Sequence, residues 1–171
     1  MKRHFTVSTF VAAHGFTLLH WHRKNRMWLP PGGHIEADED PHQAALREAE
    51  EEAGFPVVIM PTSPPLAYAS PPQLPAPVTI MVEHIPAARG EAAHQHIDLI
   101  YFARPVDNNL PVPPDGPWMW LSSAILKARE PLAWPGLEAV AIPEDVCVLG
   151  LAAIERAAQE AGARVEGRQG S

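Results

Sequence analysis

The sequence predicts an α/β fold in which a mixed β-sheet lies between helices. Three observations lead to this prediction: strand-like segments recur along the chain, helices are few, and one central helix has clear start and stop signals. The 171 residues, 46% of them hydrophobic, are enough to bury one core. We expect a single domain over residues 1–161 and a flexible C-terminal tail over residues 162–171.

The N-terminal segment is predicted to form strands. Residues 5–13 and 16–22 show the alternation of a strand on either side of a turn that contains Gly15. A short strand at residues 28–29 leads into two prolines and two glycines at residues 30–33. Residues 30–33 should therefore form a tight loop that leads toward the start of the central helix.

The central helix is predicted to run from Pro41 to Ala53. Asp40 is a good N-cap, Pro41 suits the first helical position, and Gln43 completes a capping box. Gly54 follows the last apolar residue and should end the helix.

Two proline-rich segments divide the rest of the chain. Residues 61–77 contain seven prolines and cannot form a central strand or a helix, and a second such segment spans residues 105–117. The elements predicted around them are strands at residues 57–60, 78–85, 96–103 and 118–121, a short helix capped by Ser122, and a longer amphipathic helix at residues 144–161.

The central helix concentrates negative charge on one face. At about 100° per residue, Glu48, Glu51 and Glu52 fall within an arc of roughly 100°, whereas Glu50 points elsewhere. Like charges at these spacings repel one another, so a cation should lie among them. Arg47 can reach only part of the cluster. A hard divalent ion with oxygen ligands is the better partner, and Mg²⁺ fits best, with Mn²⁺ as a substitute.

Residues 33–55, GHIEADEDPHQAALREAEEEAGF, fit the spacing G-x5-E-x7-R-E-U-x-E-E-x-G-U, where U is a bulky aliphatic residue. On this motif the chain resembles the Nudix hydrolases, the family of the MutT-type pyrophosphohydrolases. All seven fixed positions match, a coincidence with a probability on the order of 10⁻⁸ at a given start. Ala49 and Phe55 depart mildly at the two U positions. The flanking segments also look similar to the family, so the resemblance covers a whole domain.

The resemblance implies an α/β/α sandwich and a reaction. The expected enzyme acts on phosphoric anhydride bonds: with Mg²⁺, an activated water cleaves a diphosphate linkage in a nucleoside diphosphate derivative. The implied catalytic residues are Glu39, Arg47, Glu48, Glu51 and Glu52, with Glu39 and Arg47 bracing the loop against the helix. The implied metal ligands are Glu48, Glu51, Glu52 and a carbonyl of Gly32 or Gly33.

The general base is left open between two places. Within the motif, Glu52 is our choice. Outside it, Glu91 lies in a predicted loop, and His94, His96 and Asp98 share one strand face by two-residue alternation. A His-x-His pair can also bind Zn²⁺, although histidines on a strand are more often surface or core residues.

Substrate binding is assigned to polar residues on two segments. His20, Arg23 and Lys24 precede the double glycine and are candidates to meet distal phosphates, and His96 and Asp98 are added from the strand face. The alternative for the first three is an exposed basic turn.

The charge distribution limits the partners. The net charge is −7, and residues 33–55, with eight acids and one Arg, account for all of it. Without a basic face, long nucleic acid is an unsuitable partner, and a small nucleoside diphosphate derivative is expected. Cys147 is the only cysteine, and no apolar run approaches transmembrane length. We expect a cytoplasmic protein without membrane partners, and a homodimer is left open.

Two other functions are weighed against hydrolysis. A noncatalytic binding module would keep the fold and sense a nucleotide or metabolite, but its usual mark is a broken motif. An isomerase on the same scaffold would need an added acid–base pair, and the sequence identifies none.

Overall fold

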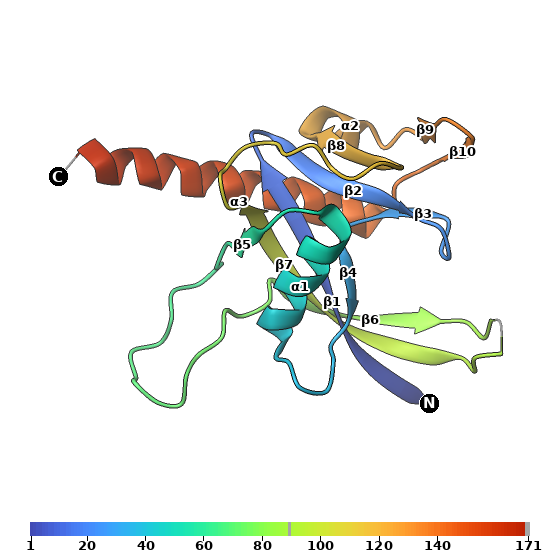
Figure 1. Ribbon diagram of the computed structural model, residues 1–171, viewed down its shortest axis with the longest axis horizontal. Helices are drawn as coiled ribbons and strands as arrows, with labels where there is room; N and C mark the ends of the chain where they lie inside the picture. The colour runs from blue at the N-terminus through green and yellow to red at the C-terminus, as the bar shows by residue number, and fades with distance from the viewer. Residues whose placement is uncertain (89, 170–171) are drawn as a thin grey trace.

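The structure is a computed structural model that describes residues 1–88 and 90–169, with side-chain surroundings as far as residue 163 (Figure 1). Within this part of the chain, eight strands form one sheet and two form a separate small sheet. The elements in chain order are β1 (Lys2–Ala13), β2 (Phe16–His22), β3 (Met27–Leu29), β4 (Gly32–His34), α1 (Pro41–Ala53), β5 (Val57–Ile59), β6 (Thr79–Ile85), β7 (His94–Pro105), β8 (Trp118–Ser122), α2 (Ser123–Ala128), β9 (Leu132–Trp134), β10 (Leu137–Val140) and α3 (Glu144–Gln169).

The centre of the large sheet is a long parallel pair. β1 and β7 run side by side from the Lys2–His94 pair to the Val11–Ala103 pair. All other pairs between the described strands are antiparallel: β6 and β5 extend the sheet beyond β7, β4 and β2 pair with β1, and β3 and β8 pair with β2. The sheet is therefore mixed, as predicted.

Helices cover both faces of this sheet. In Figure 1, α1 lies in front of the central strands and α3 runs behind them. On the α1 side, alanines of the helix pack against apolar residues of β1 and β7, and on the α3 side a second core includes Phe10, Ile100, Phe102, Val146 and Ala153. This arrangement confirms the predicted sandwich. The core on the α1 side includes Val7, Val11, Ala44, Ala45, Ala49, Ala53, Tyr101 and Ala103.

The boundaries of α1 follow from its caps. The Gln43 amide donates to the Asp40 side chain at 2.9 Å, and the Asp40 amide donates to the Gln43 side chain at 2.9 Å. At the other end, Gly54 adopts φ 77°, a left-handed conformation in which its amide donates to the Glu50 carbonyl. Both ends match the prediction, so the helical phase of the glutamates is fixed by local sequence.

Four elements differ from the prediction. Gly32–His34 forms strand β4 against β1, and β9 and β10 form a hairpin that the sequence pattern did not indicate. α3 continues from the expected end at Ala161 to Gln169. Mobility of residues 162–171 stays a prediction, and residues 170 and 171 lie outside the described part of the chain.

The first proline-rich segment forms neither helix nor strand over residues 61–77, all of which are described. It makes the long loop at the lower left of Figure 1. Among the described helices, none combines the length and the apolar character needed to cross a membrane.

Candidate active site

The double glycine brings the backbone of β4 into contact with the carboxylates of α1. The Gly32 amide donates a hydrogen bond to Glu52 Oε2 at 3.0 Å. A Cβ at Gly33 would collide with the Glu48 carboxylate, and one at Gly32 would collide with the Val7 carbonyl. Glycine at both positions therefore allows the strand to lie between β1 and the acidic face of the helix.

Arg47 connects this acidic face to the loop before the helix. Its guanidinium donates to both carboxylate oxygens of Glu39, at 2.9 and 2.6 Å, and to the His34 carbonyl at 3.1 Å. It also donates to Glu48 at 2.8 Å and to Glu51 at 3.3 Å. The hydrogen bonds from Arg47 are the main cause that lowers the pKa of Glu39. The structure thus brings all five predicted catalytic residues together, with Arg47 in the bracing position.

Glu52 has a different environment from its two neighbours. The described contacts of Arg47 extend to Glu48 and Glu51 but not to Glu52. Burial is the main cause that raises the pKa of Glu52, and the charges of Glu48 and Glu51 add to it, against the Gly32 hydrogen bond. Glu50 is exposed, as the helical phase predicts.

His20 lies at the edge of this cluster as a neutral ring. Its Nε2 is 3.8 Å from Glu52 Oε2, close enough for an ion pair if the ring were protonated. Burial, and then the proximity of His22, lowers the pKa of His20 to about 4, so the contact is not an ion pair at neutral pH. The ring stacks on Trp118 with centroids 4.6 Å apart.

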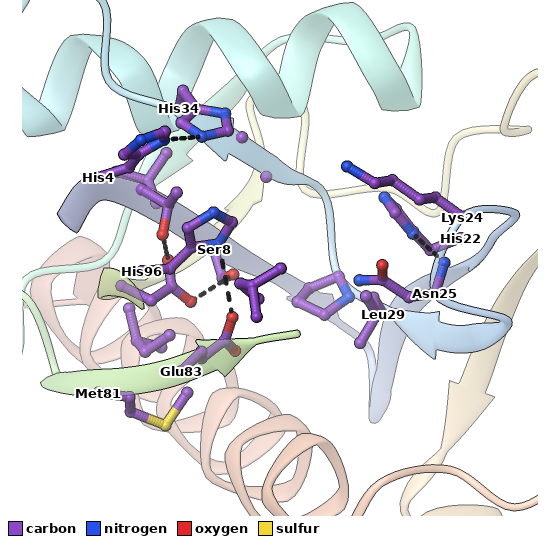
Figure 2. Close-up of a pocket in the computed structure, with 18 of the residues that line it drawn as sticks. His4, Ser8, His22, Lys24, Asn25, Leu29, His34, Met81, Glu83 and His96 are labelled. Atoms are coloured by element: carbon purple, nitrogen blue, oxygen red, sulfur yellow. Dashed lines mark hydrogen bonds and ion pairs between the residues drawn. The ribbon is translucent and has the colours of Figure 1, made fainter. Parts of the chain in front are cut away.

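A pocket of about 570 Å³ opens beside the double glycine, which forms part of its wall. This size falls within the range of small-molecule sites. Its remaining walls come from β1, β2, β3, β6, β7, the first turns of α3, and the connections between β2 and β3 and between β6 and β7. Figure 2 shows His4, His34 and His96 at one end of this central pocket and His22 and Lys24 at the other. The acidic face of α1 and the central pocket therefore meet at Gly32 and Gly33.

Asp98 lies in the pocket wall, and each of its carboxylate oxygens accepts a hydrogen bond from β1. Thr6 Oγ1 donates to Oδ1 and Ser8 Oγ donates to Oδ2, each at 2.8 Å. Burial raises the pKa of Asp98, and the two hydroxyl groups partly oppose that shift. The carboxylate thus joins β7 to β1 across the parallel pair.

Comparisons with known proteins assign the family. The family model for the NUDIX domain matches residues 2–140. The chain belongs to the Nudix family. A solved structure of a NUDIX-family hydrolase from Clostridium perfringens is 29% identical, with a TM-score of 0.68 over 91% of this chain and 98% of that chain. The structure of a UDP-X diphosphatase, 14% identical, has a TM-score of 0.50 over 90% of this chain and 63% of that chain, which supports the fold alone.

No curated protein matches this chain. Family membership makes this Nudix protein a hydrolase that acts on pyrophosphate bonds, in a family that generally uses a divalent metal ion. The donor set fits such an ion. Glu48, Glu51 and Glu52 supply carboxylate oxygens, the ligands that hard divalent cations prefer, at the place where Gly33 leaves room for one of them.

The predicted substrate-binding residues divide into two groups. His20, Lys24, His96 and Asp98 line the central pocket, as does Glu91. Arg23 is exposed and is not part of its wall.

Sequence reasoning missed several polar residues of the central pocket. His4, Thr6 and Ser8 alternate along β1 and so share one face, a signal that the sequence does contain. His34 directly follows the double glycine, and Glu83 comes from the edge strand β6. These residues come together only through pairing between strands that are far apart in the sequence. A local sequence pattern does not predict such pairing.

Proposed function

We propose that this Nudix hydrolase is a Mg²⁺-dependent pyrophosphohydrolase that cleaves a diphosphate linkage in a nucleoside diphosphate derivative. The observation that carries the proposal is the meeting of Glu48 and Glu52 with the Gly32–Gly33 backbone at the wall of a pocket of about 570 Å³, with Glu51 joined to Glu48 through Arg47. A pocket of that size accommodates a nucleoside, and the adjacent acidic face is the place for its diphosphate. The products are a monophosphate and a phosphorylated remainder.

The three carboxylates, with a carbonyl of Gly32 or Gly33, would hold Mg²⁺, with Mn²⁺ as a substitute. When bound, the ion neutralises the charge of the diphosphate oxygens and lowers the pKa of a water molecule. The chain's own contribution begins with Arg47 and Glu39, whose double hydrogen bond fixes the loop against α1. Because Arg47 also donates to Glu48 and Glu51, this fixes the position of the loop relative to these carboxylates.

Glu52 is the proposed general base. Its position supports this role, because one of its oxygens accepts from the Gly32 amide while Arg47 is engaged with Glu39, Glu48 and Glu51. Proton acceptance by a positioned carboxylate fits the attack of water on phosphorus. Lys24 lines the central pocket at the end away from His4 and His34, where it lies 3.7 Å from Glu91, and it would meet a distal anionic group of the substrate.

The proposal is tested by a substrate panel in ¹⁸O-water with Mg²⁺. The panel contains nucleoside triphosphates, oxidised nucleotides, nucleotide sugars, ADP-ribose and dinucleoside polyphosphates, and mass spectrometry identifies the products. We expect at least one substrate to give a product labelled on a phosphate oxygen, and no label on sugar or carbon. Reactions with a chelator in place of Mg²⁺ are the control.

Two other outcomes would contradict hydrolysis of a diphosphate. A noncatalytic binding module would yield no product from any member of the panel. An isomerase would convert its substrate without taking up ¹⁸O on phosphorus, so isoprenoid diphosphates are included as a further arm.

A further inference from the structure

We propose that His4, His34 and His96 form a binding site for a divalent transition-metal ion of the zinc type, separate from the carboxylates of α1. The three residues lie on adjacent strands: His4 on β1, His34 on β4 and His96 on β7. His4 and His96 are paired in register, and His34 is paired with Thr6, two residues further along β1. Because alternate residues of a strand share a face, all three rings point to the same side of the sheet.

The ring nitrogens are close enough to share one ion. One nitrogen from each residue lies within 4.8 Å of the other two. The rings of His4 and His34 are already in contact through a hydrogen bond of 3.1 Å between His4 Nδ1 and His34 Nε2, which leaves His4 Nε2 without a partner in the described part of the chain. Two imidazole nitrogens on a tetrahedral zinc ion, each at 2.0–2.1 Å, are separated by about 3.3 Å. The rings would therefore need to draw together by at most about 1.5 Å to complete the coordination.

A second observation points to a missing ligand at the same place. Nε2 of His4 and Nε2 of His96 are buried and have no hydrogen-bond partner within the described part of the chain. Buried polar atoms of this kind are uncommon in folded proteins and call for an explanation, and a bound ion is one of the standard explanations. Two of them in one cluster of three histidines favour a bound ion over simple ring packing.

The surroundings of His96 resemble those of a metal-bound histidine. Its Nδ1 lies 3.9 Å from Glu83 Oε2, an ion-pair distance longer than a hydrogen bond, and Figure 2 marks this contact on the side away from His4. Histidines that bind a metal through one nitrogen commonly direct the other toward a carboxylate, which fixes the ring. Glu83 is therefore assigned a positioning role behind His96.

The donor type distinguishes this site from the acidic face of α1. Imidazole nitrogens suit Zn²⁺, Ni²⁺, Cu²⁺ and Fe²⁺, whereas Mg²⁺ prefers oxygen ligands. Asp98 is not counted as a ligand, because the donor atoms that lie within 4.8 Å of one another belong to His4, His34 and His96 only. Three protein ligands leave a fourth position, and since all three histidines line the central pocket, that position faces it.

The test measures metal binding in protein from which every affinity tag has been removed. Zn²⁺ is titrated by calorimetry in excess Mg²⁺, which occupies the carboxylates of α1. We expect one Zn²⁺ per chain, and with Co²⁺ as a probe we expect the visible absorption bands of four-coordinate cobalt. Glu48→Gln/Glu51→Gln/Glu52→Gln should retain this binding, because none of the three carboxylates belongs to the histidine site.

Single variants identify the ligands. His4→Ala, His34→Ala and His96→Ala should each weaken Zn²⁺ binding by more than about 100-fold, and Glu83→Gln by about 10- to 100-fold, the range for a residue behind a ligand. His94→Ala is the matched control. The His94 ring stacks on His4 with centroids 5.0 Å apart, but His94 is not one of the three proposed ligands. Its loss should therefore change the affinity for Zn²⁺ by only a few-fold.

The outcome that overturns the proposal is Zn²⁺ affinity unchanged in all three alanine variants, or a six-coordinate cobalt spectrum in the wild type. Should a variant fail to fold, ¹⁵N NMR of the wild-type imidazoles decides. Zn²⁺ must shift the ring nitrogens of His4, His34 and His96 and leave those of His42, which lies on α1, in place. No readout involves hydrolysis, so this proposal and the proposed function can fail independently.

Discussion

A single guanidinium organises most of the charge at this site. Arg47 donates to Glu39, Glu48 and Glu51 and to one backbone carbonyl, a set that a lysine ammonium could not reproduce because it lacks the planar fork. The hydrogen bonds with Glu39 also raise the pKa of Arg47 further above its usual range. Of the four fixed glutamates of the motif, Glu52 is the one to which Arg47 makes no described hydrogen bond, so its carboxylate is left to act on metal or water.

Glu52→Gln should lower kcat by more than about tenfold, equivalent to about 1.4 kcal/mol of barrier, with Mg²⁺ present. A glutamine oxygen can still accept from the Gly32 amide, so the melting temperature should change little. What the amide cannot do is accept a proton from water or bind a divalent ion equally well. Steady-state kinetics on an active substrate measures the effect.

The control for this variant is Glu50→Gln, on the same helix but exposed. Its kcat should stay within about twofold of the wild type, because a neutral change on the solvent side touches neither metal nor substrate. A large loss at Glu50, or none at Glu52, would show that the assignment of the helix face is wrong.

Glu39→Gln should reduce the free energy of unfolding at neutral pH by about 1–2 kcal/mol, because one charged hydrogen bond to Arg47 is lost. The pKa of Glu39 in the folded protein is lower than its ordinary value of 4.5. The stabilisation is therefore fully present above pH 4.5 and is lost as the pH falls through the folded pKa. Chemical denaturation of wild type and variant over this pH range should show the two curves converging in acid.

Glu138→Gln is the matched control, since Glu138 forms an exposed ion pair with Arg26 at 3.4 Å. Exposed pairs contribute less than about 1 kcal/mol, so this variant should differ little from the wild type at any pH. Equal effects at Glu39 and Glu138 would remove the bracing role of the Glu39–Arg47 contact.

Among the elements, α1 depends on the residue that ends it. Gly54→Ala should lower the free energy of unfolding by about 1–2 kcal/mol, because an L-residue with a Cβ is strained at φ 77°. The new methyl group would also press on Pro114, whose Cγ lies 3.2 Å from the position that this Cβ would take. Thermal and denaturant unfolding measure the loss.

Gly162→Ala on α3 should have the opposite effect on stability from Gly54→Ala. A Cβ there meets nothing within 4 Å, and Gly162 lies within the helix as the structure has it. Alanine should stabilise the protein by up to about 1 kcal/mol if the helix is formed at this position in solution. A neutral result would favour the sequence-based prediction of a flexible tail from residue 162.

The elements that the sequence predicted well are those specified locally. The bounds of α1 follow from Asp40, Gln43 and Gly54, and the strands around it follow from their alternation. β4 was missed because two glycines carry no side-chain pattern, although its pairing with β1 is what places them against Glu48 and Glu52.

In the candidate site too, the residues specified by local sequence were predicted and those that depend on strand pairing were largely missed. The motif residues were predicted together because they lie on one helix and one short loop. The central pocket was predicted only in part, because His4 and His96 are 92 positions apart and meet through the register of β1 with β7. No spacing rule within a segment can supply that register.

At the scale of the whole molecule, metal binding and stability should be coupled. An ion that binds the folded protein and not the unfolded chain contributes about 2.7 kcal/mol when its concentration is 100 times Kd. For a chain of this size, that corresponds to a rise in Tm of about 5–10 °C. Differential scanning calorimetry in Mg²⁺, against a monovalent salt of equal ionic strength, measures the shift.

Glu48→Gln/Glu51→Gln should reduce this shift to less than half, since two of the three carboxylates are then neutral. An unchanged Tm of the wild type at saturating Mg²⁺ would count against a preformed metal site on the folded protein.

The parallel pairing of β1 with β7 also has a consequence for synthesis. β1 occupies the centre of the sheet, yet it is synthesised about 90 residues before its parallel partner β7 is complete at Pro105. At 5–20 residues per second, roughly 5–20 s pass during which the apolar N-terminal segment has no central neighbour to pair with. The nascent chain is thus exposed to aggregation during this interval, and holding chaperones should improve its yield more than they would for a protein whose central strands are contiguous.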